Sequence, residues 1–233
     1  ALHEPIAIVG IGCRFPGGAS SPAQFWEMLH GGRDVIREVP ADRWDIERYY
    51  HPDPDVPGRM YSRHGGFLAE SLQEFDARFF GISPKEADSL DPQQRLLLET
   101  SWEALEHAGI APSSLVGSDA GVFVGIGTAD YLAKMQVQSD PRIIDPYAGT
   151  GGGYCVASGR LSFFLGLQGP NIAVDSACSS SLVSVLMAVQ SLRNRSCSLA
   201  LAGGVNAIIS PETTVYMCNL RALSTAGRCA TFD

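Results

Sequence analysis

The chain has 233 residues, of which 45% are hydrophobic, and its 17 basic and 25 acidic side chains give a formal net charge of −8 at pH 7. This composition is typical of a folded, soluble protein and excludes an intrinsically disordered one. It contains no run of Lys and Arg and no long glycine-free apolar stretch, which argues against a nucleic-acid-binding protein and against a membrane span.

Six cysteines are scattered along the chain without a CxxC pair, and no signal peptide precedes them. This predicts reduced thiols and a cytoplasmic location rather than a disulfide framework. His51 and His64 have no partners at metal-ligand spacing, so we expect no metal site. The chain begins at Ala1 without methionine and stops at ATFD, and we expect it to be part of a longer protein.

The opening residues 6–11 are apolar and predict a short strand running into a Gly/Pro loop. Gly10 and Gly12 resemble the start of a GxGxxG dinucleotide-binding motif, but Phe15 occupies the position of its third glycine, which argues against that interpretation. A short helix is expected over 22–29. Residues 40–66 are polar and aromatic and predict an ordered surface excursion, because residues such as Trp44 give it surface to bury.

Residues 91–109 predict a helix with Asp91 as N-cap, Pro92 in the first turn and Gly109 as C-cap. Residues 120–127 form a short, continuous apolar run bounded by glycines, which is typical of a strand buried on both faces. The glycine-rich stretch 147–160 indicates a loop that enters a helix.

A strand over 171–177, a helix over 179–194 and a strand over 199–209 are expected to follow, and 211–233 indicates short helix and loop. The helix 179–194 should bury its large apolar residues, which recur at helical spacing: Leu182, Val185, Leu186, Val189 and Leu192. Alternation of strands and helices with short turns predicts an α/β fold with a mostly parallel sheet and helices outside it.

Cys178 falls at the junction of the expected strand and helix, and we expect it on the first turn of the helix. A helix N-terminus favours the thiolate, which is the nucleophilic form, and its free N–H groups can receive an oxyanion. Position alone leaves two interpretations open, because buried structural cysteines are also common. The thiol is either a nucleophile or a core residue.

Several motifs together resemble one family. They include EPIAIVGIGCRFPGG, FDARFFGISPKEADSLDPQQRLLLETSWEALEHAGI, GRLSFFLGLQGPNIAVDSACSSSLVSV, LALAGGVNAIISPE and LSTAGRCATFD. In this order and over essentially the whole chain they resemble β-ketoacyl synthases, specifically the ketosynthase domains of modular type I polyketide synthases. The resemblance implies a thiolase-like fold with αβαβα layers, present here as its N-terminal part, and a homodimer.

The resemblance further implies that Cys178 accepts an acyl chain from an acyl carrier protein, for decarboxylative Claisen condensation with a malonyl-type extender. The domain would bind no metal or redox cofactor, and phosphopantetheine would arrive on the carrier protein. Thr128 matches a position that lines the acyl pocket in related synthases, and the segment from Tyr147 to Tyr154 matches one that approaches the pocket of the partner subunit. Cysteine rather than glutamine at position 178 argues against a decarboxylating loading domain.

In this family two histidines and a lysine, from later HGTGT and NxGH segments, complete the site, and the sequence contains neither segment. The resemblance therefore implies that 1–233 is the N-terminal part of a single ketosynthase domain, and that condensation needs its remainder and neighbouring synthase domains as partners. Two alternatives stay open: a non-catalytic dimerisation or carrier-docking fragment, and a fatty-acid synthase condensing domain. The GIGCRFPGG and DPQQRLLLE segments favour the polyketide type.

Overall fold

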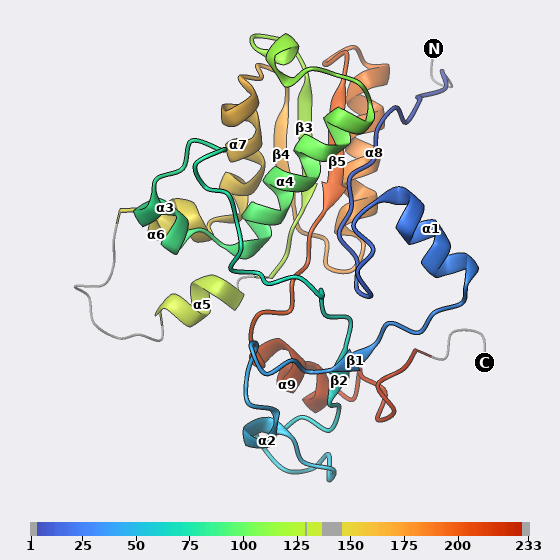
Figure 1. Ribbon diagram of the computed structural model, residues 1–233, viewed down its shortest axis with the longest axis vertical. Helices are drawn as coiled ribbons and strands as arrows, with labels where there is room; N and C mark the ends of the chain where they lie inside the picture. Colours follow the sequence, from blue (N-terminus) through green and yellow to red (C-terminus); the bar gives the residue numbers. More distant parts are fainter. Residues whose placement is uncertain (1–3, 129, 137–145, 230–233) are drawn as a thin grey trace. The chain divides into compact units, whose positions relative to one another are not determined.

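The computed structural model describes residues 4–128, 130–136 and 146–229 (Figure 1). The chain divides into two compact units. The first unit combines Ala1–Cys13 with Leu72–Asn206, and the second combines Arg14–Ser71 with Ala207–Asp233. Each unit is described by itself.

The first unit carries the parallel sheet and the helices that cover it. Its elements in chain order are α3 (Pro84–Ser89), α4 (Pro92–His107), the 3-10 helix η1 (Pro112–Leu115), β3 (Gly121–Gly125), α5 (Asp130–Gln136), α6 (Ala148–Gly152), α7 (Tyr154–Leu165), β4 (Asn171–Val174), α8 (Ser180–Arg193) and β5 (Ala200–Gly204). The strands lie in the order β4-β3-β5. Both pairings are parallel, with Phe123 opposite Ile172 and Ala202, which confirms the predicted α/β fold.

Strand β3 is buried along its whole length because helices cover both faces of the sheet. Side chains alternate along a strand, so neighbouring residues of β3 face opposite layers. Val122 and Val124 join a core cluster with residues of α4 and α7, such as Leu98 and Leu161. Phe123 joins Ala188 of α8 in a separate cluster. This explains why the strand is continuously apolar, as the sequence indicated.

Helix α8 packs on β3 and β5 with its small residues, contrary to the expectation from its sequence. Ser180, Ser184 and Ala188 are buried, whereas Leu182 is 74% and Leu186 53% exposed. The reason is a set of glycines, described below, that brings the helix axis close to the sheet and leaves room for small side chains only. The predicted burial of the large apolar residues is wrong for Leu182, Val185 and Leu186, which are exposed.

The strand expected over 6–11 does not form, since these residues have no regular secondary structure. The segment packs against α4 instead of pairing with a strand. A Cβ on Gly10 would lie 2.1 Å from Ala104 O, and one on Gly12 would lie 2.0 Å from Thr100 O. Ile11 N donates to His107 Nδ1 at 3.1 Å. Apolar side chains are not enough for a strand, because its backbone groups also need a neighbouring strand.

The cap residues of helix α4 lie at the predicted positions or one residue away from them. The side chain of Asp91 accepts from Gln93 N at 2.8 Å as N-cap, Pro92 is the first helical residue, and Gly109 has φ 66°, just beyond the C-cap Ala108. The glycine-rich stretch is more helical than expected. It contains α6, a five-residue helix, before α7 begins at Tyr154.

The second unit holds residues 40–66 together with the tail. Its elements are α1 (Pro22–His30), β1 (Arg37–Glu38), α2 (Ile46–Tyr49), β2 (His64–Gly65) and α9 (Glu212–Asn219), with β1 and β2 paired antiparallel. Trp44, Met60 and Tyr61 are buried in one cluster with Phe67 and Cys218 of α9. The aromatic residues of 40–66 thus make a small core, which accounts for the order of that segment.

Candidate functional site

Cys178 is an exposed residue in the turn between β4 and α8. The strand ends at Val174, and α8 begins at Ser180 with Ser179 as N-cap. Cys178 therefore directly precedes the N-cap, and the expectation that it lies on the first turn of the helix is wrong. The hydroxyl groups of Ser179 and Ser180 bond backbone groups of residues 176 and 177, and these local bonds compete with an earlier start of the helix.

The turn is held by short local hydrogen bonds. Ala177 N donates to Asp175 Oδ1 at 2.9 Å, and Ser176 N donates to Ser180 Oγ, also at 2.9 Å. Ser180 Oγ in turn donates to Ala177 O at 2.7 Å. Ala177 has φ 55°, a left-handed conformation that costs an alanine on the order of 1 kcal/mol. The strained turn places Cys178 at an exposed position.

Glycines let the first turn of α8 touch the sheet. A Cβ on Gly125, the last residue of β3, would lie 2.6 Å from the carbonyl carbon of Ser180. A Cβ on Gly204, the last residue of β5, would lie 2.6 Å from Ser181 Cβ. Ser184 Oγ reaches Gly203 O at 2.7 Å. The strand ends and the start of α8 thus form one tightly packed support beneath the cysteine turn.

Thr128 lies three residues beyond the end of β3 and is half-buried. Its Oγ1 lies 3.1 Å from Gln93 Oε1 and 3.2 Å from Asn206 Oδ1. Gln93, at the start of α4, is fully buried and donates from Nε2 to Thr128 O at 2.9 Å. The structure thus places the predicted Thr128 in a polar cluster whose other members sequence reasoning missed.

Asp91 forms the buried end of this cluster. The pKa of its carboxyl is raised to about 6, chiefly by burial and in smaller part by the negative charge of Asp130. Hydrogen bonds from Gln93 and the positive charge of Arg95 act in the opposite direction. Burial also raises the pKa of Tyr154, helped by the negative charge of Asp175. The first unit therefore concentrates acidic groups beside the C-terminal ends of its strands.

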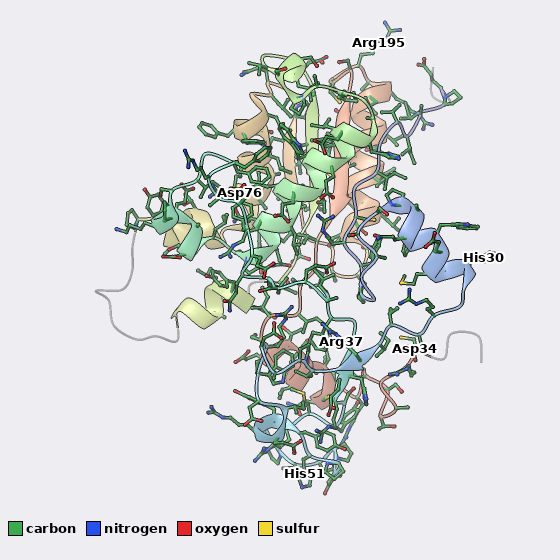
Figure 2. All side chains as sticks on the ribbon, in the orientation of Figure 1. His30, Asp34, Arg37, His51, Asp76 and Arg195 are labelled. Carbon is green, nitrogen blue, oxygen red and sulfur yellow. The ribbon has the colours of Figure 1, made fainter. Side chains whose placement is uncertain are left out.

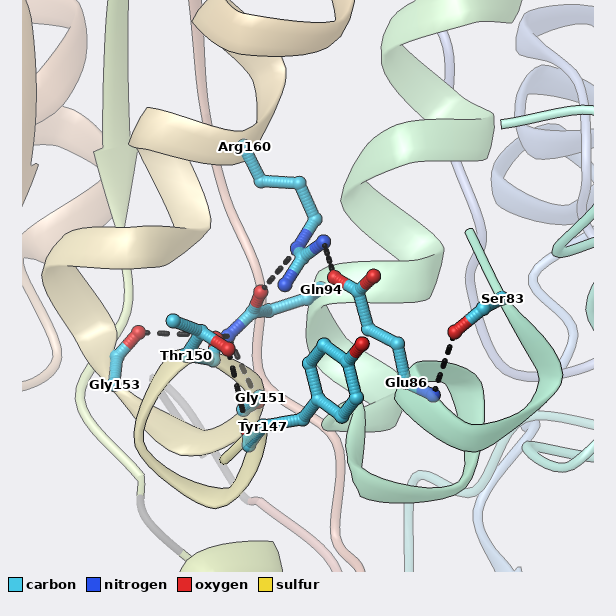
Figure 3. A network of polar contacts seen from close by, with 8 residues as sticks. All are labelled: Ser83, Glu86, Gln94, Tyr147, Thr150, Gly151, Gly153 and Arg160. Carbon is cyan, nitrogen blue, oxygen red and sulfur yellow. Dashed lines mark hydrogen bonds and ion pairs between the residues drawn. The ribbon is translucent and has the colours of Figure 1, made fainter. Parts of the chain in front are cut away.

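Tyr147, the other predicted substrate-binding residue, lies in a second network (Figure 3). Its carbonyl oxygen accepts from Gly151 N at 2.6 Å. Gln94 Nε2 donates to Gly151 O at 2.8 Å, and Gln94 Oε1 accepts from Arg160 Nε at 2.9 Å. Arg160 also pairs with Glu86 at 2.6 Å. This network fixes the segment 147–153 to α3, α4 and α7, and Gln93 and Gln94 link it through α4 to the Thr128 cluster.

The described histidines are divided between the two units. His30 ends α1 and His51 follows α2 (Figure 2), and His64 begins β2; all three belong to the second unit. His107, in the first unit, ends α4 and is about 21 Å along the helix from Gln93, at 1.5 Å per residue. His3 lies outside the described residues. Within 4–128, 130–136 and 146–229 there is no group of three or more His, Cys, Asp or Glu arranged to hold a metal ion.

The same described ranges contain no helix long and apolar enough to cross a membrane. Of the residues missed, Asp175 and Asn206 carried a readable signal. Each follows the end of an observed parallel strand, and such ends meet at one edge of a sheet, but the expected strands 171–177 and 199–209 ran past both residues. Gln93 carried none, because its partner lies 35 residues away and a glutamine in a helix gives no sign of burial.

Comparison with known proteins identifies the family. The model of "Beta-ketoacyl synthase, N-terminal domain" matches residues 3–233. A phenolphthiocerol/phthiocerol polyketide synthase of Mycobacterium tuberculosis is 53% identical over 233 residues, which are 100% of this chain and 15% of that protein. Polyketide synthase GfsB of Streptomyces halstedii is 49% identical over 234 residues, 100% of this chain and 4% of that protein.

Two solved ketosynthases share the fold. The oxazolomycin ketosynthase domain OzmH KS7 of Streptomyces albus JA3453 aligns with a TM-score of 0.88 and 39% identity, over 97% of this chain and 39% of that chain. The module 6 ketosynthase of the Bacillus subtilis bacillaene synthase aligns with a TM-score of 0.81 and 35% identity, over 94% of this chain and 35% of that one. The chain thus spans well under half of these relatives. It belongs to the β-ketoacyl synthase family, as a thiolase-like ketosynthase N-terminal domain of the polyketide synthase type.

Proposed function

We propose that Cys178 accepts an acyl chain from an acyl carrier protein, as the nucleophile of a polyketide ketosynthase. The thiolate attacks the thioester carbonyl, a new sulfur–carbon bond forms, and the carbon–sulfur bond to the carrier's phosphopantetheine breaks. The proton lost from Cys178 is taken up by the leaving phosphopantetheine thiolate, which becomes the free thiol. The acyl-enzyme is then the partner for decarboxylative condensation with a malonyl-type extender.

The observation that carries this proposal is an exposed cysteine residue on a strained turn between a parallel strand and a helix. Ala177 at φ 55° and the Asp175 hydrogen bond hold the turn, so the thiol is presented without a search through many conformers. A strand-to-helix turn of this kind presents nucleophiles in other enzymes. A structural cysteine would be buried, as Cys197 and Cys218 are.

We further propose that residues 1–233 are the N-terminal part of one ketosynthase domain that works in a cytoplasmic homodimer beside the other domains of a synthase. The catalytic histidines implied by the family would then come from outside these residues. Support comes from the 39% share of the solved OzmH domain that the chain covers, and from the remote position of His107. Condensation would need that remainder, whereas acyl capture depends chiefly on Cys178.

The test is the mass of the protein after incubation with a simple acyl thioester such as acetyl-N-acetylcysteamine. We expect one acyl group per chain, mapped to the Cys178 peptide and absent in Cys178→Ala. Cys155→Ala is the matched control, because Cys155 is another exposed thiol of the first unit. Acyl groups spread equally over Cys155 and Cys178, or no acylation in the complete synthase, would favour a non-catalytic docking fragment.

A further inference from the structure

We propose that Gln93 is a positioning residue for the acylation of Cys178, acting through the backbone of residues 126–128. The inference rests on the function proposed above and adds a residue to it. Gln93 lies at the start of α4, far in sequence from the cysteine turn, and is linked to that turn through an intermediate segment.

The first link joins Gln93 to Thr128. The carboxamide of Gln93 accepts from Thr128 Oγ1 at 3.1 Å and donates to Thr128 O at 2.9 Å, so it grips one residue through both its side chain and its backbone. Gln93 is itself held, because Asp91 Oδ1 accepts its N–H at 2.8 Å and Asp91 Oδ2 accepts from its Nε2 at 3.3 Å. A fully buried side chain with these bonds is a rigid clamp.

The second link joins the segment 126–128 to the cysteine turn. Ile126 N donates to Val174 O at 3.1 Å, which extends the β3–β4 pairing beyond the strand ends. A Cβ on Gly127 would lie 2.8 Å from Asp175 Oδ1, so the backbone of Gly127 lies directly against that carboxylate. The same Oδ1 accepts the N–H of Ala177, the residue before Cys178.

The third observation is that the clamp ties together the segments that follow all three parallel strands. Thr128 follows β3, Asp175 follows β4, and Asn206, whose Oδ1 lies 3.2 Å from Thr128 Oγ1, follows β5. Loss of the Gln93 carboxamide removes two of the hydrogen bonds of Thr128 and so loosens the neighbouring Gly127, which lies against Asp175. A displacement of about 1 Å at a nucleophile can slow its reaction severely while leaving its exposure unchanged.

The experiment uses the complete protein that carries these residues. It distinguishes a change in the position of the Cys178 thiol, which lowers acetylation alone, from a change in its accessibility, which lowers acetylation and alkylation together. The rate of acetylation of Cys178 is measured over a range of acetyl-N-acetylcysteamine concentrations, and alkylation by iodoacetamide is measured in parallel. For Gln93→Met we expect a fall of about tenfold in the maximal acylation rate, with Cys178 alkylation within about twofold of wild type. The exposed Cys229 is the internal reference for alkylation.

Thr100→Val is the control, because Thr100 lies on the same helix and its Oγ1 donates to Leu96 O within that helix. Its acylation rate should stay within about threefold of wild type. Equal losses in both variants, or parallel losses of acylation and alkylation, would overturn the inference and leave the proposed function standing. Absence of wild-type acylation would instead overturn the proposed function, and the inference with it.

Labelling of the buried thiols Cys13, Cys197 and Cys218 would reveal whether Gln93→Met unfolds. In that case a second pair of variants, at Thr128, tests the role of Gln93. Thr128→Ser keeps the hydroxyl that Gln93 accepts from, and Thr128→Val removes it. We expect Thr128→Ser to keep the maximal acylation rate within about threefold of wild type and Thr128→Val to lower it about tenfold. Equal rates for the two variants would contradict the role of the clamp.

Discussion

Gly125 faces the backbone of Ser180 across a gap that no side chain can occupy, since a Cβ there would lie 2.6 Å from the carbonyl carbon. For Gly125→Ala we therefore expect the free energy of unfolding to fall by about 1–3 kcal/mol, because backbone atoms must move. Gly203→Ala is the control, since a Cβ on Gly203 meets no atom within 4 Å. Urea unfolding of both variants checks the difference, and equal stabilities would contradict it.

The buried carboxyl of Asp91 makes stability depend on pH in an unusual direction. Its pKa of about 6 in the folded protein exceeds the ordinary value of 3.8, so its stabilising contribution is complete below pH 3.8 and is lost as the pH rises through 6. We expect Asp91→Asn, which keeps the N-cap acceptor, to gain about 2–2.5 kcal/mol relative to wild type between pH 4 and pH 7.5.

Unfolding curves at the two pH values measure this effect, with Asp34→Asn as a control of opposite sign. Hydrogen bonds from Ile36 and Arg228 lower the pKa of the exposed Asp34 below its ordinary value. That substitution should therefore cost stability at neutral pH and lose its effect as the pH falls. A pH-independent difference between Asp91→Asn and wild type would contradict the burial of the Asp91 charge.

The ion pair between Arg160 and Glu86 is shielded from solvent, with side-chain exposures of 12% and 22%. Arg160→Met leaves the carboxylate of Glu86 and the amide oxygen of Gln94 without their donor. We expect a loss of about 2–4 kcal/mol in the free energy of unfolding. Asp55→Asn, which breaks the exposed pair with Arg221, should cost less than about 1 kcal/mol. Equal losses in thermal or urea unfolding would refute the shielding argument.

The left-handed conformation of Ala177 makes its substitutions predictable. Glycine tolerates this conformation, so Ala177→Gly relieves strain and loses chain entropy in similar amounts, and its stability should lie within about 1 kcal/mol of wild type. Ala177→Val places a β-branched side chain in the same conformation and should lose about 2 kcal/mol or more. Circular dichroism during unfolding distinguishes the two, and a stable valine variant would mean that the turn relaxes easily.

The parallel sheet and its helices could be predicted because their signals are local. The run 120–127 is apolar and bounded by glycines, and the residues that cap α4 lie next to the helix itself in the sequence. The expected strand over 6–11 failed because a strand depends on a partner, which no local pattern reveals. Similarly, the burial of Gln93 and Gln94 depends on backbone groups 35 and 57 residues away.

The candidate site was predictable in part, because the signature around Cys178 identifies the residue but not its surroundings. Thr128 and Tyr147 came from the resemblance, and the structure places them in two clusters that meet at adjacent glutamines of α4. The start of α8 lies later than expected, since hydroxyl groups that bind the turn compete with helix formation. Contacts of this kind depend on geometry that residue types do not specify.

The small buried face of α8 reverses the usual relation between hydrophobicity and tolerance to substitution. Polar replacements of Leu182 or Leu186 remove side chains that are mostly exposed in this fold, whereas Ser184 has no exposed surface and its hydroxyl bonds Ser181 O and Gly203 O. A scan of substitutions scored on the stability of these residues would mark the serines as constrained and the leucines as permissive. A design that kept Leu182 and Leu186 but varied Ser180 and Ser184 would therefore disturb the packed face of this helix and preserve the exposed one.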